Sequence, residues 1–438
     1  MVFTVKDILQ MEVAPALGCT EPTAVALGAA TAMSMLQNKQ IDSIEVTVDP
    51  NVYKNGFAVS IPGAEHHTGI DVAAALGAFG GDAMRKLEVL DSVSAESLKQ
   101  AVAFVKAKKV TINLKDGHVG IFIHVKVTAG SESAEAQIEK THDNITRMIR
   151  NGKDLPCAAL LTSIKESRLV LSELEDWLKT MTLEQLLALL DDLDDEDMAF
   201  LKQGVETNMK LADHGLMYGP GLAVGSTLNR LMREGMLKQD IVLAAKMLTS
   251  AASDARMAGV KLPAMSSAGS GNHGLTAILP IWAVKDYLVC TEEETLKAIA
   301  LSHIITGYIK AYTGRLTAVC GCSIAAGAGA TAGITYLMGG NLKHIAGAIK
   351  NIIGDLAGVI CDGAKAGCAL KLSTAAGTAV QAALFSLRGI NIQSTDGIVG
   401  SSGEQTMQNM GQLSTQGMIA ADRTILNIMV NKKFDMVE

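Results

Sequence analysis

The hydrophobic pattern of this 438-residue chain changes near residue 150, and that change limits the folds open to it. Before residue 150, apolar and polar side chains alternate, as at 44–48 and 110–114, which predicts β-strands with one buried face. After it, runs rich in Ala, Leu and Gly follow one another with short breaks, which is typical of closely packed helices. We therefore expect an α+β fold, with a small mixed sheet domain over residues 1–150 and a large helical domain over residues 151–438.

Local patterns in the first region predict further elements. Lys115 to His118 is suited to a hairpin turn between the strand at 110–114 and a second strand at 121–127. Helical patterns cover three stretches, which are 72–86, 94–108 and 133–151. A first helix is expected over 20–37, with Thr20 as its cap and Pro22 in its first turn. The sheet would then carry its helices on one side.

The second region contains two stretches whose charge is informative. The acidic run at 191–197 predicts a solvated helix end or turn between two helical patterns. Residues 316–341 carry no charge and exceed the roughly 20 residues needed to cross a bilayer. They contain few large apolar side chains, however, so they would insert weakly into a membrane. A buried helix is the interpretation that the sequence favours.

Composition argues against several classes of partner. The net charge is -7, and no dense basic run with interleaved aromatic residues is present, so we expect no nucleic-acid partner. The first residues lack the basic segment and apolar core of a secretion signal, so we expect a cytoplasmic protein without a membrane partner. The chain has 42 glycines, and because glycine-rich helical faces can pack closely, we also expect a homodimer.

Five of the seven cysteines lie in three short segments flanked by glycine or other small residues. The segments are GCTEP at 18–22, CGC at 320–322 and CDGAKAGC at 361–368. They are spread over about 350 residues, which suits a soft-metal site assembled by the fold, such as an iron–sulfur cluster. The alternative is that a cysteine is simply a small buried apolar residue, and we assign that role to Cys157 and Cys290. For the CGC and CDGAKAGC segments, the local pattern alone leaves both interpretations open.

Two segments are suited to holding an anion. Cys19 and Glu21 fall at the start of the first predicted helix, where unpaired N–H groups favour a thiolate or a bound anion. The Gly/Ser-rich loop at 266–274 precedes an apolar helical run, and it could turn several N–H groups toward a carboxylate or phosphate. It matches neither nucleotide-binding fingerprint. A plain helix cap and a plain connector are the alternatives, although Asn272 and His273 add polar groups suited to a ligand.

Together these segments resemble the L-cysteine desulfidase family, which is akin to the α-domain of oxygen-sensitive iron–sulfur L-serine dehydratases. The resemblance is carried in order by residues 18–24, 267–272, 320–322 and 361–365, and residues 208–215 and 253–257 also fit it. It therefore covers nearly the whole chain, and it is closest to bacterial members of that family to which no activity is assigned.

The resemblance implies a [4Fe–4S] cluster held by three cysteines, with one iron left open. It also implies a β-elimination that converts a small amino acid, L-cysteine, to pyruvate, ammonia and sulfide. L-Serine would react by the same mechanism. The alternative is a non-catalytic amino-acid-binding or redox-sensing protein on the same scaffold.

Roles for individual residues follow from the resemblance as well. Cys361 is the first expected ligand, Cys320 or Cys322 the second, and the third is Cys19 or Cys368. The side chains expected to bind the substrate carboxylate and amine are those of Thr20, Ser267, Ser270 and Asn272. The general base stays open among three side chains, those of Glu21, His273 and Lys365. His273 is the obvious choice chemically, but related chains often have glutamine at that position.

Overall fold

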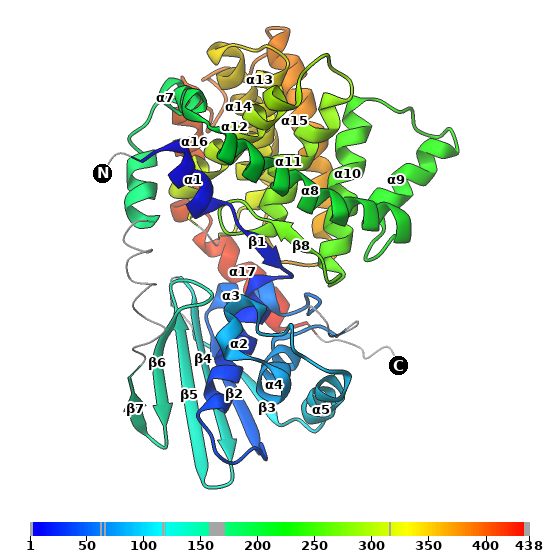
Figure 1. The fold of residues 1–438 in the computed structure, drawn as a ribbon. Coiled ribbons are helices and arrows are strands. Elements are labelled where there is room, and N and C mark those ends of the chain that lie inside the picture. Colours follow the sequence, from blue (N-terminus) through cyan, green and yellow to red (C-terminus); the bar gives the residue numbers. More distant parts are fainter. Residues whose placement is uncertain are drawn as a thin grey trace.

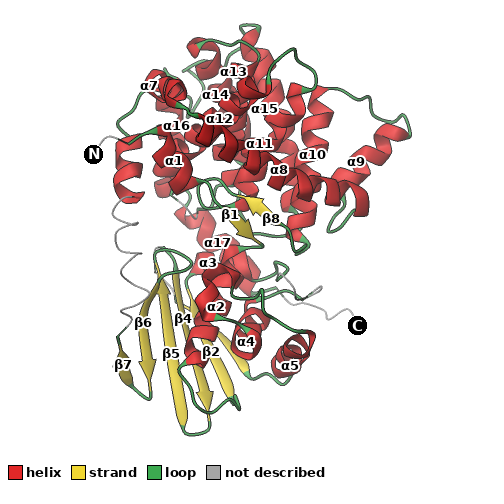
Figure 2. Cartoon of the chain, viewed as in Figure 1, coloured by secondary structure: helices red, strands yellow, loops and turns green. Residues whose placement is uncertain are grey.

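A helical region and a smaller region built on a β-sheet lie one above the other in the computed structural model (Figure 1). The structure describes residues 3–61, 64, 67–115, 118, 120–156, 171–314 and 317–432. The mixed α+β class expected from the sequence is confirmed, with a six-stranded mixed sheet first and a largely helical region after it. Figure 2 shows that the strands gather in the lower region, apart from a short pair near the boundary.

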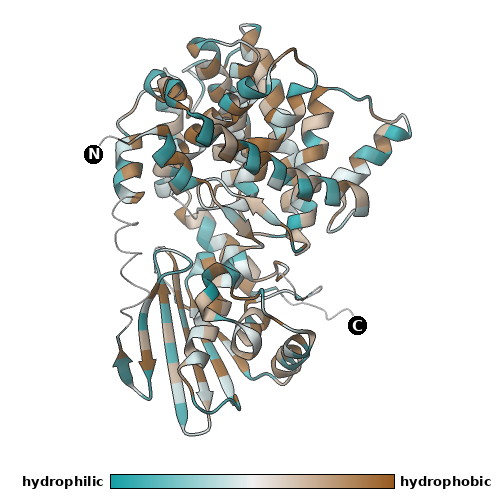
Figure 3. Ribbon diagram, in the orientation of Figure 1, coloured by the Kyte–Doolittle hydropathy of each residue, from teal (hydrophilic) through white to brown (hydrophobic). Residues whose placement is uncertain are grey.

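The sheet has the strand order β3-β2-β4-β5-β6-β7. The strands are β2 (Ser43–Val48), β3 (Val110–Leu114), β4 (Phe122–Ala129), β5 (Glu132–Glu139), β6 (Ile145–Arg150) and β7 (Lys153–Leu155). β2 and β3 are parallel, and the remaining neighbours are antiparallel. The predicted alternation holds in β2, where Ile44, Val46 and Val48 are fully buried. Figure 3 shows hydrophobic and hydrophilic residues alternating along the strands.

The hairpin predicted at 115–118 is wrong. β3 and β4 do not pair with each other, because β2 lies between them and pairs with both. The connection over residues 115–121 can reach about 23 Å when extended, which is enough to pass the end of one strand. Lys115 accordingly continues the parallel pairing by donating its N–H to the Val48 carbonyl, 2.8 Å away. Asp116 and Gly117 lie outside the described residues.

The helix predicted over 133–151 is also wrong, since β5 and β6 occupy that stretch. Alanine and glutamate are good helix formers, and they misled the prediction. The apolar side chains of β5 in fact recur every second residue, and Ala134, Ala136 and Ile138 are fully buried against the helices above the sheet. Packing between neighbouring strands overrides the local preference here.

The helices of this region cover one face of the sheet (Figure 1). They are α2 (Thr20–Ser34), α3 (Pro50–Gly56), α4 (Ile70–Gly80), the 3-10 helix η1 (Ala83–Glu88) and α5 (Ala95–Lys106). The predicted helices at 20–37 and 94–108 are confirmed, whereas the one at 72–86 divides because Gly81 is extended. The α2 cap is Cys19 rather than Thr20, so that prediction is off by one residue. α2 and α4 touch closely, since a Cβ on Gly77 would lie 2.1 Å from the Ala26 carbonyl oxygen.

The upper region is built almost entirely from helices. They are α1 (Val5–Glu12), α7 (Leu183–Ala188), η2 (Leu189–Asp192), α8 (Asp195–Tyr218), α9 (Val224–Arg233), α10 (Ile241–Met257), α11 (Gly271–Lys285), α12 (Glu292–Thr313), α13 (Gly321–Leu337), α14 (Leu342–Leu356), α15 (Cys368–Leu387), α16 (Gly403–Gln412), a π turn η3 (Leu413–Gly417) and α17 (Ile419–Val430). The acidic run forms the end of η2 and the start of α8, as predicted, and the side chain of Asp194 caps α8.

The uncharged stretch at 316–341 contains α13, a helix whose residues 323–335 are all buried. The prediction of a buried helix is therefore confirmed for its described part, which leaves out Leu316. Among the described residues one helix, α15, is long and apolar enough to cross a membrane, but 61% of its 18-residue apolar window is buried in the protein. It is a core helix. The cytoplasmic location, the homodimer and the absence of a nucleic-acid partner stay predictions.

The first residues of the chain run along the boundary between the two regions. α1 buries Val5, Ile8 and Leu9 in the apolar core of the upper helices. The chain then forms β1 (Pro15–Leu17), which pairs antiparallel with β8 (Pro263–Met265). β1 ends two residues before Cys19, and β8 ends just before the Gly/Ser-rich loop, so this pair brings the two segments together. The domain boundary near residue 150 stays a prediction.

Candidate functional site

Four cysteines gather where α13 and α15 begin. Cys320 is the residue before α13, Cys322 lies in its first turn, and Cys368 starts α15. Cys361 lies in the loop that leads to α15. Cys320 is buried and the other three are half-buried, and all four are free thiols. The fold therefore joins the CGC and CDGAKAGC segments, as the sequence suggested it should.

Backbone hydrogen bonds hold the two cysteine segments side by side. An antiparallel bridge immediately precedes each of them. The N–H of Cys320 donates to the Val359 carbonyl at 2.9 Å, and the N–H of Cys361 donates to the Ala318 carbonyl at 2.6 Å. Because these contacts use the main chain, they fix the positions of the two sulfur-bearing residues relative to each other.

The thiols influence one another's ionisation. A hydrogen bond from the Cys322 thiol lowers the pKa of Cys320, and the same contact raises the pKa of Cys322 well above its ordinary value. Burial raises the pKa of Cys361, and it raises that of Cys368 to about 12. The charges of Cys320 and Cys361 also raise the pKa of Cys368. Several thiolates can coexist at such a site only beside compensating positive charge or a metal.

Three lysines supply positive charge around the thiols. Lys371 pairs with Asp362 at 2.5 Å and donates to the Ile360 carbonyl at 2.9 Å. Lys365 donates to the Asp362 carbonyl, and burial lowers its pKa. The third, Lys54 of α3, is only 2% exposed, and its charge lowers the pKa of Cys361. Lys54 also forms an ion pair of 2.5 Å with an aspartate of α17, so the site lies where the two regions meet.

Cys19 stands apart from the four. It is buried at the start of α2 and packs with Val59 and Met257, and Cys368 touches the edge of this group. Burial raises the pKa of Cys19 to about 11, and the nearby Arg256 guanidinium partly offsets this effect. The structure thus brings Cys19 near the cysteine site, with an arginine as its charged neighbour.

Several polar side chains of the Gly/Ser-rich loop already have partners within the protein. The hydroxyl of Ser267 is fully buried and lies 2.9 Å from Nδ1 of His303. Asn272, which is 4% exposed, accepts a hydrogen bond of 3.0 Å from Arg256. Ser270 is the half-buried residue just before α11. Ser270 and Asn272 lie at the start of that helix, which begins at Gly271, within the segment that the sequence predicted as a loop.

The three candidate bases lie at three places around the site. His273 has its Nδ1 3.2 Å from the Ser267 carbonyl, and its Nε2 faces Gly321, where a Cβ would lie only 2.4 Å away. Its ring therefore reaches the backbone between the two cysteines of the CGC segment. Lys365 lies in the loop before α15. Glu21 accepts a hydrogen bond from Thr20 at 3.2 Å and lies 3.8 Å from Nε2 of His142.

Replacing Gly321 with Ala is expected to destabilise the fold by about 1–3 kcal/mol, because the new methyl group would overlap the His273 ring. Chemical denaturation would measure the change. Gly367→Ala is the matched control, because a Cβ there meets nothing within 4 Å. Equal stabilities of the two variants would contradict the close contact between His273 and Gly321.

Sequence reasoning missed three residues of this site: Lys54, His142 and His303. None belongs to a motif, and each reaches the site from a distant part of the chain. The one available signal is that His303 is the single basic residue between Lys297 and Lys310, in a largely apolar stretch of α12. Lys54 and His142 carry no comparable signal, since a lysine in a short helix and a histidine in a strand connection are common surface features.

The cysteine site suits a cluster better than a single ion. Among the residues that the structure describes, no three His, Cys, Asp or Glu side chains are placed to hold one metal ion. A single zinc ion needs ligands about 2.0–2.3 Å from its centre. In an iron–sulfur cluster each thiolate binds a different iron, so the sulfurs can lie further apart, and a set of thiols is the donor set that such clusters take.

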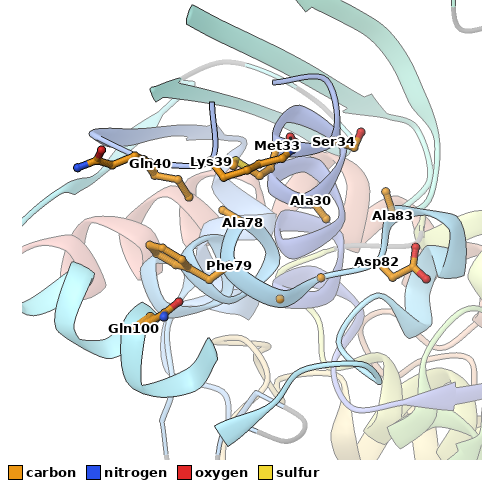
Figure 4. Close-up of a pocket in the computed structure, with 13 residues that line it drawn as sticks. Ala30, Met33, Ser34, Lys39, Gln40, Ala78, Phe79, Asp82, Ala83 and Gln100 are labelled. Carbon is orange, nitrogen blue, oxygen red and sulfur yellow. Dashed lines mark hydrogen bonds between the residues drawn. The ribbon is translucent and has the colours of Figure 1, made fainter. Parts of the chain in front are cut away.

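A separate hollow of about 770 Å³ lies in the lower region, lined by residues of α2, α4 and α5 and the segments beside them. Figure 4 shows Met33, Lys39, Phe79, Asp82 and Gln100 around it. No described cysteine or histidine lines it. None of the cysteines or candidate bases described above lines this hollow.

Fold and site together define a mixed α+β protein whose helical region gathers four thiols at the starts of two buried helices. The chain belongs to the serine dehydratase alpha chain family, whose model matches residues 84–427. That range contains the four gathered cysteines and the Gly/Ser-rich loop, whereas Cys19, Thr20 and Glu21 precede it.

Close relatives span the whole chain. It is 62% identical to a UPF0597 protein of Desulfatibacillum aliphaticivorans over 436 residues, which is 99% of each chain. It is 56% identical to a UPF0597 protein of Desulfotalea psychrophila over 430 residues, 98% of each. A UPF0597 protein of Clostridioides difficile is 44% identical over 426 residues, which is 97% of this chain and 98% of the relative.

Proposed function

We propose that this protein is an iron–sulfur-dependent lyase that eliminates the β-substituent of L-cysteine, giving pyruvate, ammonia and sulfide. The observation that carries the proposal is the gathering of four thiols beside His273. Membership of a family of iron–sulfur serine dehydratase alpha chains supports a lyase. The name of that family also favours a second candidate substrate, L-serine, which would lose water by the same elimination.

Cys320, Cys361 and Cys368 are the ligands that we propose for the cluster. They act on one another electrostatically, and their segments are tied together through the backbone. Cys322 would instead donate a hydrogen bond to Cys320. Cys19 has Arg256 as its neighbour and lies outside the family match, so we assign it no cluster iron. This choice follows the dehydratase pattern rather than the desulfidase pattern.

When bound, a [4Fe–4S] cluster with one iron free of protein ligands would supply a Lewis acid beside the leaving group of the substrate. Lys54, Lys365 and Lys371 offset the negative charge of the thiolates. Among the candidate bases we favour His273, because donation of its Nδ1 proton to the Ser267 carbonyl would make Nε2 the basic nitrogen, on the side facing the CGC segment.

The elimination needs two changes in the substrate. A base removes the proton from the α-carbon, and the bond from the β-carbon to sulfur breaks, so that sulfide leaves with the electron pair. The product is aminoacrylate, which takes up water to give pyruvate and ammonia. Oxidation states balance without an external oxidant or reductant.

An anaerobic screen of the reconstituted protein tests this function. L-Cysteine, L-serine and L-threonine should be compared with their D-enantiomers, with keto acid, ammonia and sulfide as readouts. We expect pyruvate and sulfide in equal amounts from L-cysteine. Pyruvate from L-serine alone would move the assignment to the second candidate. Binding of these amino acids without any product would instead favour a non-catalytic binding protein.

A further inference from the structure

Arg256 is a buried guanidinium in the last turn of α10. Only 5% of the residue is exposed. Nη1 donates to the side-chain oxygen of Asn272 at 3.0 Å, and Nη2 donates to the Gly18 carbonyl at 2.6 Å. Nε has no hydrogen-bond partner among the described residues. Both oxygens that accept from the guanidinium are neutral, and the side chain of Cys19 also interacts with it.

No described carboxylate forms an ion pair with this guanidinium, and two acids of the neighbouring segments, Asp254 and Glu21, have other partners. Asp254 accepts a hydrogen bond of 3.0 Å from the Gly225 N–H, at the start of α9. Glu21 interacts with Thr20 and His142. A buried charge is normally paired, because desolvation of an unpaired charge is costly. No carboxylate among the described residues therefore balances the charge of this guanidinium.

Two helix starts point to the same place. Gly18 lies two residues before α2, and Asn272 is the second residue of α11, so both oxygens that hold Arg256 belong to helix N-termini. Each of these helices has 15 residues, and their N-terminal ends carry partial positive charge. A Cβ on Gly271 would lie 2.4 Å from Nε, so the start of α11 packs directly against the guanidinium. These positive groups together suit a small anion.

We propose that Arg256 binds the α-carboxylate of the amino-acid substrate, an assignment that rests on the proposed function. A guanidinium matches the planar geometry of a carboxylate and can donate two parallel hydrogen bonds to it. Asn272 holds the guanidinium, and the next residue, His273, reaches the backbone between Cys320 and Cys322. One short amino acid can therefore place its carboxylate at Arg256 and its β-substituent at the thiols.

The test compares two ligands that cannot react, since neither has a leaving group. L-Alanine carries the carboxylate, and L-alaninamide replaces it with a neutral amide. Anaerobic calorimetry on the full chain should show tighter binding of L-alanine than of L-alaninamide. Arg256→Gln should weaken L-alanine binding about tenfold to a hundredfold and leave L-alaninamide binding unchanged. The affinity of Arg256→Lys for L-alanine should lie between that of the wild type and that of Arg256→Gln. Arg230→Gln, on the exposed surface of α9, is the control.

Three results would overturn the assignment. These are equal affinity of the wild type for the two ligands, unchanged L-alanine binding in Arg256→Gln, and an equal loss for both ligands, which would indicate a structural role or a counter-charge for Cys19. If Arg256→Gln does not fold, the binding of the two ligands is measured with Arg256→Lys instead. Unchanged L-alanine binding in Arg256→Lys would then overturn the assignment. Failure of this assignment can be distinguished from failure of the proposed lyase function, because carboxylate-dependent binding can persist in a protein that forms no pyruvate from L-cysteine.

Discussion

Replacing Cys361 with Ala is expected to abolish iron–sulfur cluster binding. This thiol lies in the loop tied to the CGC segment by main-chain hydrogen bonds, and its charge acts on Cys368, so we expect no other side chain to take its place. Iron and acid-labile sulfide, measured after anaerobic reconstitution, should fall to the background of the assay. The broad visible absorbance of the cluster should disappear with them.

Cys290→Ala is the matched control for that experiment. Cys290 is half-buried and lies near the carbonyl of Lys285 and the hydroxyl of Thr295, away from the cysteine site. Its replacement should leave the iron content unchanged. Cys157, to which the sequence assigns the same structural role, lies outside the described residues. Equal iron loading of wild type and Cys361→Ala would show that the cysteine site is not a cluster site.

Exposure to air is expected to remove the activity long before the protein unfolds. A site that admits a substrate to iron also admits oxygen, whereas the two large apolar clusters that stabilise the fold contain no cysteine. Activity should therefore fall to background while circular dichroism and the unfolding temperature change little. Iron, sulfide and a reductant should then restore the activity.

The control for the air-exposure experiment is a second sample that is kept under argon for the same time. Parallel loss of helical signal and activity in air would mean that the site is part of what holds the fold together. Full activity of protein that has lost its iron would instead require a base-only or a pyridoxal-dependent route.

The sequence was most informative where chemistry and local pattern coincide. The CGC and CDGAKAGC segments could be recognised because glycine-flanked cysteines differ from core cysteines, and the buried α13 because its stretch is uncharged but poor in large apolar residues. The fold class followed from the change between period-two and helical patterns near residue 150. These features depend on residues close together in the chain.

Features that depend on distant contacts could not be predicted. β5 resembles a helix in composition, and only its partner strands make it extended. Lys54 contributes to the site because α3 packs beneath the cysteine loop, where the Lys54 carbonyl leaves no room for a side chain on Gly363. Arg256 fits a motif, but its burial between two helix N-termini appears only once α2, α10 and α11 are assembled.

The most direct measurement is the yield of pyruvate and sulfide from L-cysteine as a function of bound iron. Protein reconstituted anaerobically to different iron contents should release the two products in equal amounts, at rates that rise in proportion to its iron–sulfur content. Cys361→Ala, treated in the same way, should give neither product. A rate that does not depend on iron content, or an equal rate in Cys361→Ala, would contradict the proposal that the cysteine site performs the elimination.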